Sequence, residues 1–175
     1  MEIAEAKRDD IRAIASFLHA CWQTEYRQII TADFLDTMSV DERHRRLLIR
    51  FDEGISDFLM MWDGAKMIGA SVFGKSVTDG YPEDGEISAI YLHHDYIGQG
   101  YGHTLITEIE QRLSDSGYVD FVLDVLTDNI RAVDFYRRHD YEQVDIRSIQ
   151  LGERDYSLTV FRKHNSRFSR VGGEV

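Results

Sequence analysis

A glycine-rich stretch between a predicted strand and a predicted helix constrains this fold more than any other feature of the sequence. Residues 87–92 have the apolar character of a strand, and residues 98–102 contain three alternate glycines. Apolar residues then recur at helical spacing, and residues 121–126 form a nearly continuous apolar run. Strand, helix and strand in that order predict a right-handed crossover that joins two parallel strands, with both faces of those strands covered.

The rest of the chain supplies further helices and hairpins. They are a strand from Ile3, a helix capped by Asp9 or Asp10, helices over 32–38, 40–50 and 129–139, and hairpins of 58–62 with 67–73 and of 141–151 with 156–161. In the first hairpin, Asp63-Gly64 is the pair that supplies the positive φ angles of a two-residue turn. We therefore predict a mixed α/β (α+β) fold, with one domain over residues 1–163 and a loosely held basic tail over 164–175.

Composition excludes several classes of protein. The chain has 175 residues and a single cysteine, so an internal disulfide or a cysteine-cluster zinc site is excluded. Its net charge of −11 repels phosphate backbones and anionic lipid, which argues against nucleic-acid or membrane partners and favours a cationic small molecule. The longest apolar run, residues 58–62, is far too short to span a bilayer, and the first residues lack the cationic opening of a signal peptide. We expect a cytoplasmic protein.

The three glycines, at positions 98, 100 and 102, need a physical reason. Glycine lets the chain turn tightly and lets backbone N–H groups approach a ligand. The start of the following helix adds unpaired donors and the positive end of the helix dipole. The loop therefore suits a phosphate or pyrophosphate, although a simple strand-to-helix turn could contain the same glycines.

Two other kinds of phosphate-binding loop fit less well. Gly102-His103-Thr104 lacks the lysine that a Walker loop places against the β- and γ-phosphates. A dinucleotide fingerprint needs its third glycine at position 103, where this chain has histidine, and it belongs at a first strand-to-helix turn. Asp124 alone lies near the distance that a ribose contact requires, so NAD is a weak alternative.

A second group of residues follows the second parallel strand. Asn129, Ala132, Phe135 and Tyr136 lie on or next to the predicted helix over 129–139. Taken singly, Asn129 is explained as a helix N-cap, and the two aromatic residues as core. Because the carboxyl ends of neighbouring parallel strands meet at one edge of a sheet, however, this group and the glycine loop should lie together where α/β sheets bind ligands.

These two groups resemble the signatures of the GNAT superfamily of acetyl-CoA-dependent N-acetyltransferases. The run from Tyr91 to Gly102 follows the family's Arg/Gln-x-x-Gly-x-Gly/Ala signature, and the second group matches its next block in order and spacing. Residues 22–26, with Phe34-Leu35 and 41–43, are similar to one subset of small-molecule acetyltransferases. Two positions depart from the pattern: Ile97 replaces the usual Arg or Gln, and Asp140 replaces a glycine at the helix end.

The resemblance implies a central, mostly antiparallel sheet with one parallel strand pair and flanking helices. It also implies acetyl-CoA as the cosubstrate. The loop residues Ile97, Gly98, Gln99, Gly100, Tyr101 and Gly102 would hold its pyrophosphate, the strand edge at Tyr91 and Leu92 would pair with the pantetheine amides, and Asn129 would brace it. With Ile97 in place of Arg or Gln, the phosphate contacts at the loop would come from the backbone.

The same resemblance assigns the chemistry to Glu86 and Tyr136. Glu86 would be the general base that takes a proton from the amine, and Tyr136 the general acid that protonates the departing thiolate. Glu86 also belongs to an acidic run with Asp79, Glu83 and Asp84, which can equally be read as a solvated loop or as a segment that attracts a cationic acceptor.

The acceptor side and the partners follow from weaker patterns. Trp22 and Tyr26 share a helical face and are expected either to line the acceptor pocket or to pack in the core. His93 and His94 point to opposite faces of a strand end, so no metal site is predicted. No cysteine or serine stands in a nucleophile arrangement, which favours direct transfer in a ternary complex.

The predicted activity is transfer of an acetyl group to a primary amine of a small, cationic acceptor such as a polyamine, an aminoglycoside or an amino-acid-like amine. A non-catalytic acyl-CoA-binding module and an acetyltransferase for protein N-termini or lysines remain alternatives, and a homodimer remains open.

Overall fold

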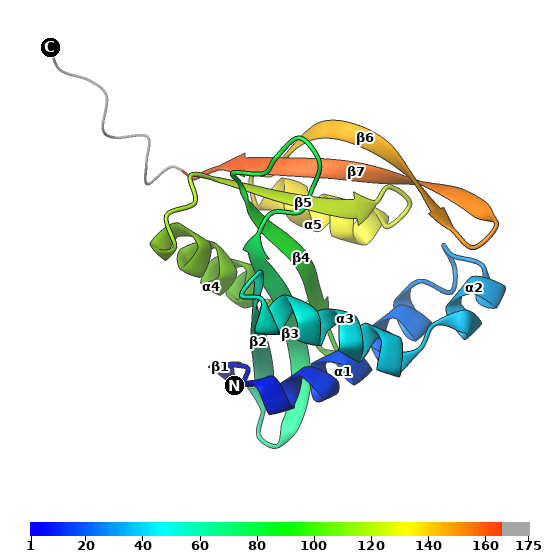
Figure 1. Ribbon diagram of the computed structural model, residues 1–175, viewed down its shortest axis with the longest axis horizontal. Coiled ribbons are helices and arrows are strands. Elements are labelled where there is room, and N and C mark those ends of the chain that lie inside the picture. Colours follow the sequence, from blue (N-terminus) through cyan, green and yellow to red (C-terminus); the bar gives the residue numbers. More distant parts are fainter. Residues whose placement is uncertain (166–175) are drawn as a thin grey trace, which may run out of the picture.

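One seven-stranded sheet organises residues 1–165, the part of the chain that the computed structural model describes (Figure 1). Its strands are β1 (Glu2–Glu5), β2 (Ser56–Asp63), β3 (Lys66–Lys75), β4 (Gly85–Leu92), β5 (Asp120–Leu126), β6 (Glu142–Leu151) and β7 (Arg154–His164). The helices are α1 (Ile11–Glu25), α2 (Ala32–Thr37), α3 (Val40–Asp52), α4 (Tyr101–Asp115) and α5 (Ile130–Arg138), with short 3-10 turns at Arg8–Asp10 and His94–Tyr96.

The order of the strands is β1-β2-β3-β4-β5-β7-β6, and every neighbouring pair is antiparallel except β4 and β5. This confirms the predicted mixed sheet with one parallel pair. The connection between β4 and β5 runs through α4, as the strand, helix and strand pattern indicates. No helix within residues 1–165 has the length and apolar content that a membrane span needs.

The parallel pair is short, and this shapes the site. Gly85 pairs with Phe121 and Glu86 with Val122, and beyond those residues the two strands no longer pair. Figure 1 shows β4 and β5 running apart, so that the sheet has one half built from β1–β4 and another from β5–β7. The edge of β4 that faces β5 is therefore without a partner strand from residue 87 onward.

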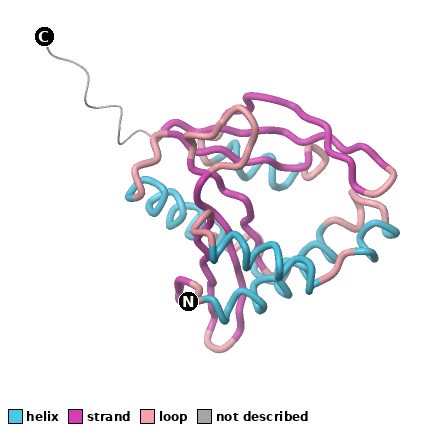
Figure 2. Tube along the Cα trace, viewed as in Figure 1, coloured by secondary structure: helices cyan, strands magenta, loops and turns pink. Residues whose placement is uncertain are grey.

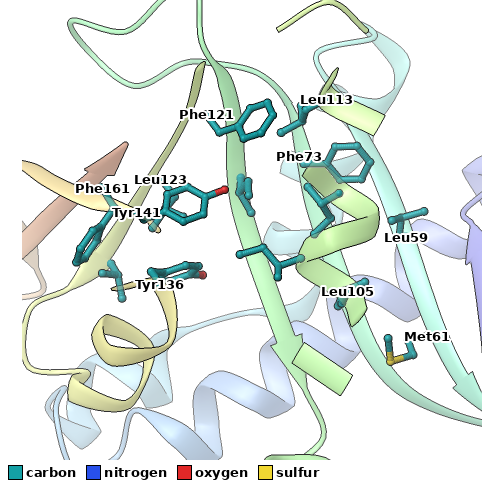
Figure 3. Close-up of a cluster of buried hydrophobic side chains, with 14 of the residues drawn as sticks. Leu59, Met61, Phe73, Leu105, Leu113, Phe121, Leu123, Tyr136, Tyr141 and Phe161 are labelled. Carbon is teal, nitrogen blue, oxygen red and sulfur yellow. The ribbon is translucent and has the colours of Figure 1, made fainter. Parts of the chain in front are cut away.

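Helices cover both faces of the sheet (Figure 2). On one face, α4 and α5 pack against both halves around Phe73, Phe121 and Phe161, and Figure 3 shows Tyr136 and Tyr141 within the same cluster. On the other face, α1 packs on β2 and β3 with α3 beside it. All four apolar positions of the predicted stripe on α4 are buried, because they recur at helical spacing: Leu105, Ile106, Ile109 and Leu113.

The short helix α2 lies beside the tip of the β6–β7 hairpin (Figure 1). The Thr31 N–H donates to the Tyr156 hydroxyl at 3.1 Å, and Phe34 lies 3.4 Å from the Cβ position of Gly152 in the hairpin turn. Gly152 has φ of +65°, which explains why a glycine ends this predicted hairpin.

Three local predictions are corrected. The first hairpin turns at Gly64-Ala65 and not at Asp63-Gly64, since Asp63 pairs with Lys66 as the last strand residue and only Gly64 has a positive φ. Asp10 makes no capping bond to α1, because its carboxylate accepts from the Lys7 N–H at 2.8 Å.

The third correction concerns the C-terminal end of the domain. β7 extends to His164, so this residue belongs to the sheet and not to a tail. Asn165 is buried, with its N–H donating to the Val119 carbonyl at 2.8 Å. The remainder of the predicted tail, residues 166–175, lies outside the described residues.

Candidate active site

The glycine loop has the conformation that its sequence requires. Gly98 and Gly100 have φ of +80° and +89°, in the left-handed region that side chains disfavour, and Gly100 is the N-cap residue of α4. A Cβ at Gly102 would lie 3.1 Å from the Phe135 ring, so this glycine permits α4 and α5 to approach each other. No side chain caps α4. Its first N–H groups are thus free to bind an anion at the positive end of the helix dipole.

A cleft of about 360 Å³ opens at this loop. One wall comes from Ile90 and Leu92 of β4 and the other from Ala132 and Phe135 of α5, so the cleft lies where β4 and β5 part. The rest of the lining comes from the loop and from four cationic or titratable residues: Ile97, Gly98, Gly100, Gly102, His103, Arg131, Arg138 and His139. An elongated ligand in this cleft would have the unpaired backbone of β4 on one side and the N-terminus of α4 at one end.

Positive charge gathers at the cleft although the whole chain is strongly acidic. His103 Nδ1 and His139 Nε2 lie 3.1 Å apart, and His139 Nδ1 is 2.8 Å from the Phe135 carbonyl. If both rings are neutral, His139 donates to that carbonyl and accepts from His103. Arg131 forms an ion pair with Glu25, and Arg138 has no ion pair within residues 1–165. Sequence reasoning missed these four residues; the seven-residue spacing of Arg131 and Arg138 on one helix is the signal that could have found two of them.

The predicted cofactor residues divide into two groups. Leu92, Ile97 and the three glycines line the cleft, and the N–H groups of residues 99–102 lie at the start of α4. Gln99 turns its side chain back to donate to the Asp95 carbonyl at 2.6 Å. Tyr101 packs on Tyr96, with ring centroids 5.8 Å apart. The side chains of Gln99 and Tyr101 are thus not part of the lining, and any role for them in binding falls to their backbone.

Tyr91 points to the opposite face of the sheet from Leu92 and joins a polar cluster there. Its hydroxyl lies 3.1 Å from that of Tyr26, which also accepts from Asn129 Nδ2 at 3.4 Å. Trp22 stacks on Tyr26 with ring centroids 4.6 Å apart. Burial raises the pKa of Tyr91 well above its ordinary value, and the neighbouring Tyr26 raises it further. The tyrosine cluster, defined here as Trp22, Tyr26 and Tyr91 with Asn129, brings the predicted acceptor residues to β4.

The Asn129 side chain makes hydrogen bonds to both α5 and the end of α1. Its Oδ1 accepts from the Ala132 N–H at 3.2 Å, so it is the N-cap of α5, and its amide nitrogen reaches Tyr26 at the end of α1. The capping role is therefore confirmed, and the bracing of a cofactor stays a prediction. Through Asn129, the helix that carries Tyr136 is tied to the acceptor side.

Tyr136 projects from α5 into the core cluster, next to Tyr141 (Figure 3). It is 9% exposed, and burial raises its pKa, with a smaller contribution from Tyr26. A raised pKa keeps the phenol protonated throughout the neutral range, which is the form that a general acid requires. Within residues 1–165 its hydroxyl has no hydrogen bond, although the oxygen is not fully buried.

Glu86 has a different environment from the one that the sequence suggests. Its Oε2 accepts from the N–H groups of Val77 and Thr78 at 2.7 and 3.1 Å and from the Thr78 hydroxyl at 3.1 Å. Its Oε1 accepts from Ser88 Oγ at 2.5 Å and lies 3.8 Å from Arg50. The carboxylate is buried and ties the loop after β3 to β4, which is a structural role in addition to the predicted catalytic one.

The acidic run before Glu86 is solvated in part, since Asp79 and Glu83 are exposed whereas Asp84 is buried. Asp84 is 4% exposed and forms a bidentate pair with Arg162 at 2.6 and 2.9 Å. Arg162 also reaches Asp120, and Arg147 donates to the Asp79 carbonyl. Arg162 of β7 thus neutralises Asp84, whereas Arg147 contacts only the backbone of Asp79; the local sequence could not reveal either contact because both arginines lie more than 60 residues away.

Cys21 is buried in α1. Burial raises the pKa of its thiol to about 12, so it stays protonated. Within residues 1–165 no three His, Cys, Asp or Glu side chains gather in a way that could hold a metal ion.

The acetyltransferase (GNAT) family matches residues 21–141, more than half of the chain and the whole of the site just described. The chain belongs to the GNAT family. It is 30% identical over 144 residues to YuaI, an uncharacterised N-acetyltransferase of Bacillus subtilis, covering 81% of this chain and 80% of that protein.

Solved structures of GNAT-fold proteins superpose on this chain. A ribosomal-protein-alanine N-acetyltransferase from Brucella melitensis has a TM-score of 0.74 at 18% identity, covering 94% of this chain and 100% of that one. The PaiA N-acetyltransferase of Thermoplasma acidophilum, in complex with coenzyme A, has a TM-score of 0.72 at 19% identity, covering 94% and 98%. The GNAT fold is thus established.

Proposed function

We propose that this GNAT protein moves the acetyl group of acetyl-CoA to a primary amine by direct transfer within a ternary complex. The observation that carries the proposal is the cleft at the parting of β4 and β5, with a free helix N-terminus at one end and, as one wall, α5, the helix that carries Tyr136. A protonated Cys21 supports direct transfer over a cysteine-bound intermediate.

In this proposal, different residues bind the cofactor, accept the proton of the amine and donate a proton to the departing thiolate. The N–H groups at the start of α4 and the cations of the cleft bind the phosphates, and the unpaired edge of β4 orients the pantetheine chain. An aliphatic amine has a pKa near about 10, so it must lose a proton before its nitrogen forms a bond to the thioester carbon. Glu86 is the predicted acceptor of that proton, through a water. As the carbon–sulfur bond breaks, Tyr136 donates its proton to the thiolate of coenzyme A.

A calorimetric titration with acetyl-CoA and with CoA, followed by thiol release against a panel of amines, tests this proposal. Binding together with amine-dependent thiol release is the expected result. Binding with no release by any amine would instead favour a non-catalytic acyl-CoA-binding module, and absence of binding would mean that the loop has been misread.

The acceptor is a small amine in this proposal, and its protonated form makes it cationic at neutral pH. An acetyltransferase for protein N-termini remains the second candidate, because the similar Brucella protein carries the name of an enzyme that acts on a ribosomal protein. Intact-mass analysis of short peptides incubated with the enzyme and acetyl-CoA separates the two. A cytoplasmic location stays a prediction, as does a homodimer.

A further inference from the structure

Arg43 is a partly buried cation that has no anionic partner among the residues that the structure describes. It lies in the first half of α3, and its Nε is buried without a hydrogen bond. The guanidinium lies over the Trp22 ring, 5.3 Å from the ring centroid. Within residues 1–165, Arg43 has no ion pair. Burying a charged donor without a partner is costly, so a cation left in this state needs a reason.

The carboxylates next to Arg43 are all engaged elsewhere. Asp41 pairs with Arg12 at 2.8 Å, and Glu42 lies 4.0 Å from Arg46 on the same helix. Arg50, seven residues farther along α3, has partners that Arg43 lacks. It donates to two serine hydroxyls and lies close to Glu86. Acidic residues exceed basic ones by 11, so a shortage of carboxylates does not explain the state of Arg43.

The other arginines without an ion pair in the described part of the chain are Arg45, Arg138 and Arg154, and all three are exposed to solvent. Water satisfies an exposed guanidinium, whereas the Nε of Arg43 is buried without a hydrogen bond; the two terminal nitrogens are not fully buried and are the atoms that a ligand can reach. Arg43 is therefore the one arginine in residues 1–165 that combines burial with the absence of a counter-ion.

The position of Arg43 is as informative as its charge. Its guanidinium lies over the Trp22 ring, which in turn stacks on Tyr26, and both Tyr91 and Tyr26 act on the pKa of Arg43. Arg43 thus adds a positive charge to the tyrosine cluster, on the acceptor side of β4 and on the opposite face from Leu92 and the cofactor cleft. Burial lowers the pKa of Arg43, and a bound anion would oppose this effect.

We propose that Arg43 binds a carboxylate of the acceptor, so that the substrate is an aminocarboxylate and not a polyamine or an aminoglycoside. A guanidinium binds a carboxylate through two parallel N–H···O bonds, which fixes the orientation of the acceptor as well as its charge. The proposal rests on the proposed acetyl transfer and names its substrate class. It also agrees with the pairing of Asp84 to Arg162, which removes part of the negative charge that a polycation would need.

Thiol release from acetyl-CoA, measured with matched pairs of acceptors, tests this assignment. Each L-α-amino acid is compared with its carboxamide, which keeps the amine and removes the carboxylate, and spermidine and kanamycin represent the polycations. We expect at least one amino acid to have a kcat/KM at least about 10-fold above that of its amide, as the loss of a hydrogen bond to a charged group implies.

Arg43→Gln then identifies the residue responsible. This change should lower kcat/KM for the preferred amino acid by about 10- to 100-fold, through KM, and leave the amide unchanged. Arg43→Lys should restore part of the loss. Arg45→Gln removes one charge from an exposed position on the same helix and serves as the matched control, with both substrates unaffected.

Three results would overturn the inference. They are a higher kcat/KM for spermidine, kanamycin or the amides than for any amino acid, an amino-acid preference that survives Arg43→Gln, and an equal fall for acid and amide, which would indicate a structural role. Failure of the proposed function looks different, because acetyl-CoA would then bind with no thiol release from any amine. Thermal melting completes the test: Arg43→Gln should melt no lower than the wild type, since the change removes an unpaired charge.

Discussion

The cleft that we propose for acetyl-CoA (the cofactor cleft) and the tyrosine cluster with Arg43 that we propose for the acceptor (the acceptor side) are built in different ways. The cleft is formed largely by backbone and by apolar walls, with left-handed glycines and a free helix N-terminus at one end. The acceptor side is formed by side chains that come from α1, α3, β4 and the start of α5, and it holds buried hydroxyls and one unpaired arginine. A site that uses backbone can keep its ligand while side chains change, whereas the acceptor side can change its substrate by single substitutions.

Tyr136→Phe should have the largest effect. Removing the general acid should lower kcat by about 10²- to 10⁴-fold without changing the affinity for acetyl-CoA, because the cleft is lined by other residues. Stopped-flow thiol release and calorimetry measure the two quantities. Tyr141→Phe is the matched control, since its ring packs 5.8 Å from that of Tyr136 in the same core. Unchanged turnover in Tyr136→Phe would refute the assignment.

Alkaline pH should destabilise the protein through buried tyrosines. Burial raises the pKa of Tyr91, Tyr136 and Tyr141 in the folded state. Below about pH 10 all three are neutral in both states and stability is unaffected, but above it they ionise first in the unfolded chain. The free energy of unfolding should then fall by up to about 4 kcal/mol per pH unit. Urea titrations from pH 9 to 11 measure this, and Tyr141→Phe should reduce the slope by about a third.

Glu86→Gln separates the structural role of this carboxylate from its predicted catalytic one. The change places an amide N–H₂ against donors that now bind a carboxylate oxygen, and we expect a loss of about 2–3 kcal/mol in stability. Asp79→Asn, at an exposed position of the same loop, should cost almost nothing. If Glu86 is also the base, the acidic limb of the pH profile of kcat/KM disappears in the variant. A retained limb would assign the base elsewhere.

Gly100→Ala tests whether the cleft depends on backbone conformation. Gly100 and Gly117 lie at opposite ends of α4, both have a positive φ, and a Cβ at either would meet nothing within 4 Å. Each alanine variant should therefore lose about 1–2 kcal/mol of stability. Only Gly100→Ala should also weaken acetyl-CoA binding, by about 5- to 30-fold if the loop shifts to relieve the strain. Equal affinities in the two variants would show that the loop does not bind the cofactor.

Substitutions of Asp140 should have the smallest effect, and it should be on stability. It is the one residue other than glycine with a positive φ in the described chain, and it occupies the position where the family has glycine. Asp140→Gly should change stability by less than about 1 kcal/mol, because relief of strain and a more flexible unfolded chain oppose each other. Asp140→Val should cost about 1–3 kcal/mol. Thermal melting distinguishes them, and a tolerated valine would mean that the turn can rearrange.

Most of the fold could be predicted from the sequence because its signals are local. Helical spacing of apolar residues located α4, and the glycine pattern predicted both the loop and the parallel pair. The same pattern also located the loop that lines the cleft, while its binding of a cofactor stays a prediction. The turn at Gly64 was misplaced by one residue, since the pairing register across the hairpin, and not the Asp-Gly pair alone, determines where a turn begins.

What the sequence could not predict depends on contacts between distant segments. The bond between Asn129 and Tyr26 joins residues 103 positions apart, and Arg162 reaches Asp84 across 78 positions. Neither pairing leaves a periodic pattern. The buried state of Arg43 is equally hidden, because its helix has the composition of a solvated one and only the packing of α1 beside it covers the guanidinium.

Because β4 and β5 separate, acetyl-CoA bound as proposed would contribute to the structure of the sheet as well as supply the acetyl group. Two residue pairs join the strands, and farther on the acetyl-CoA of the proposed function would take the place of the missing neighbour along β4. Any ligand that binds only the folded state adds to its stability, by about 2.7 kcal/mol at a concentration 100-fold above its Kd. The lifetime of the protein in a cell should therefore depend on the supply of acetyl-CoA, so that a shortage of acetyl-CoA lowers the amount of the protein as well as the rate of acetyl transfer.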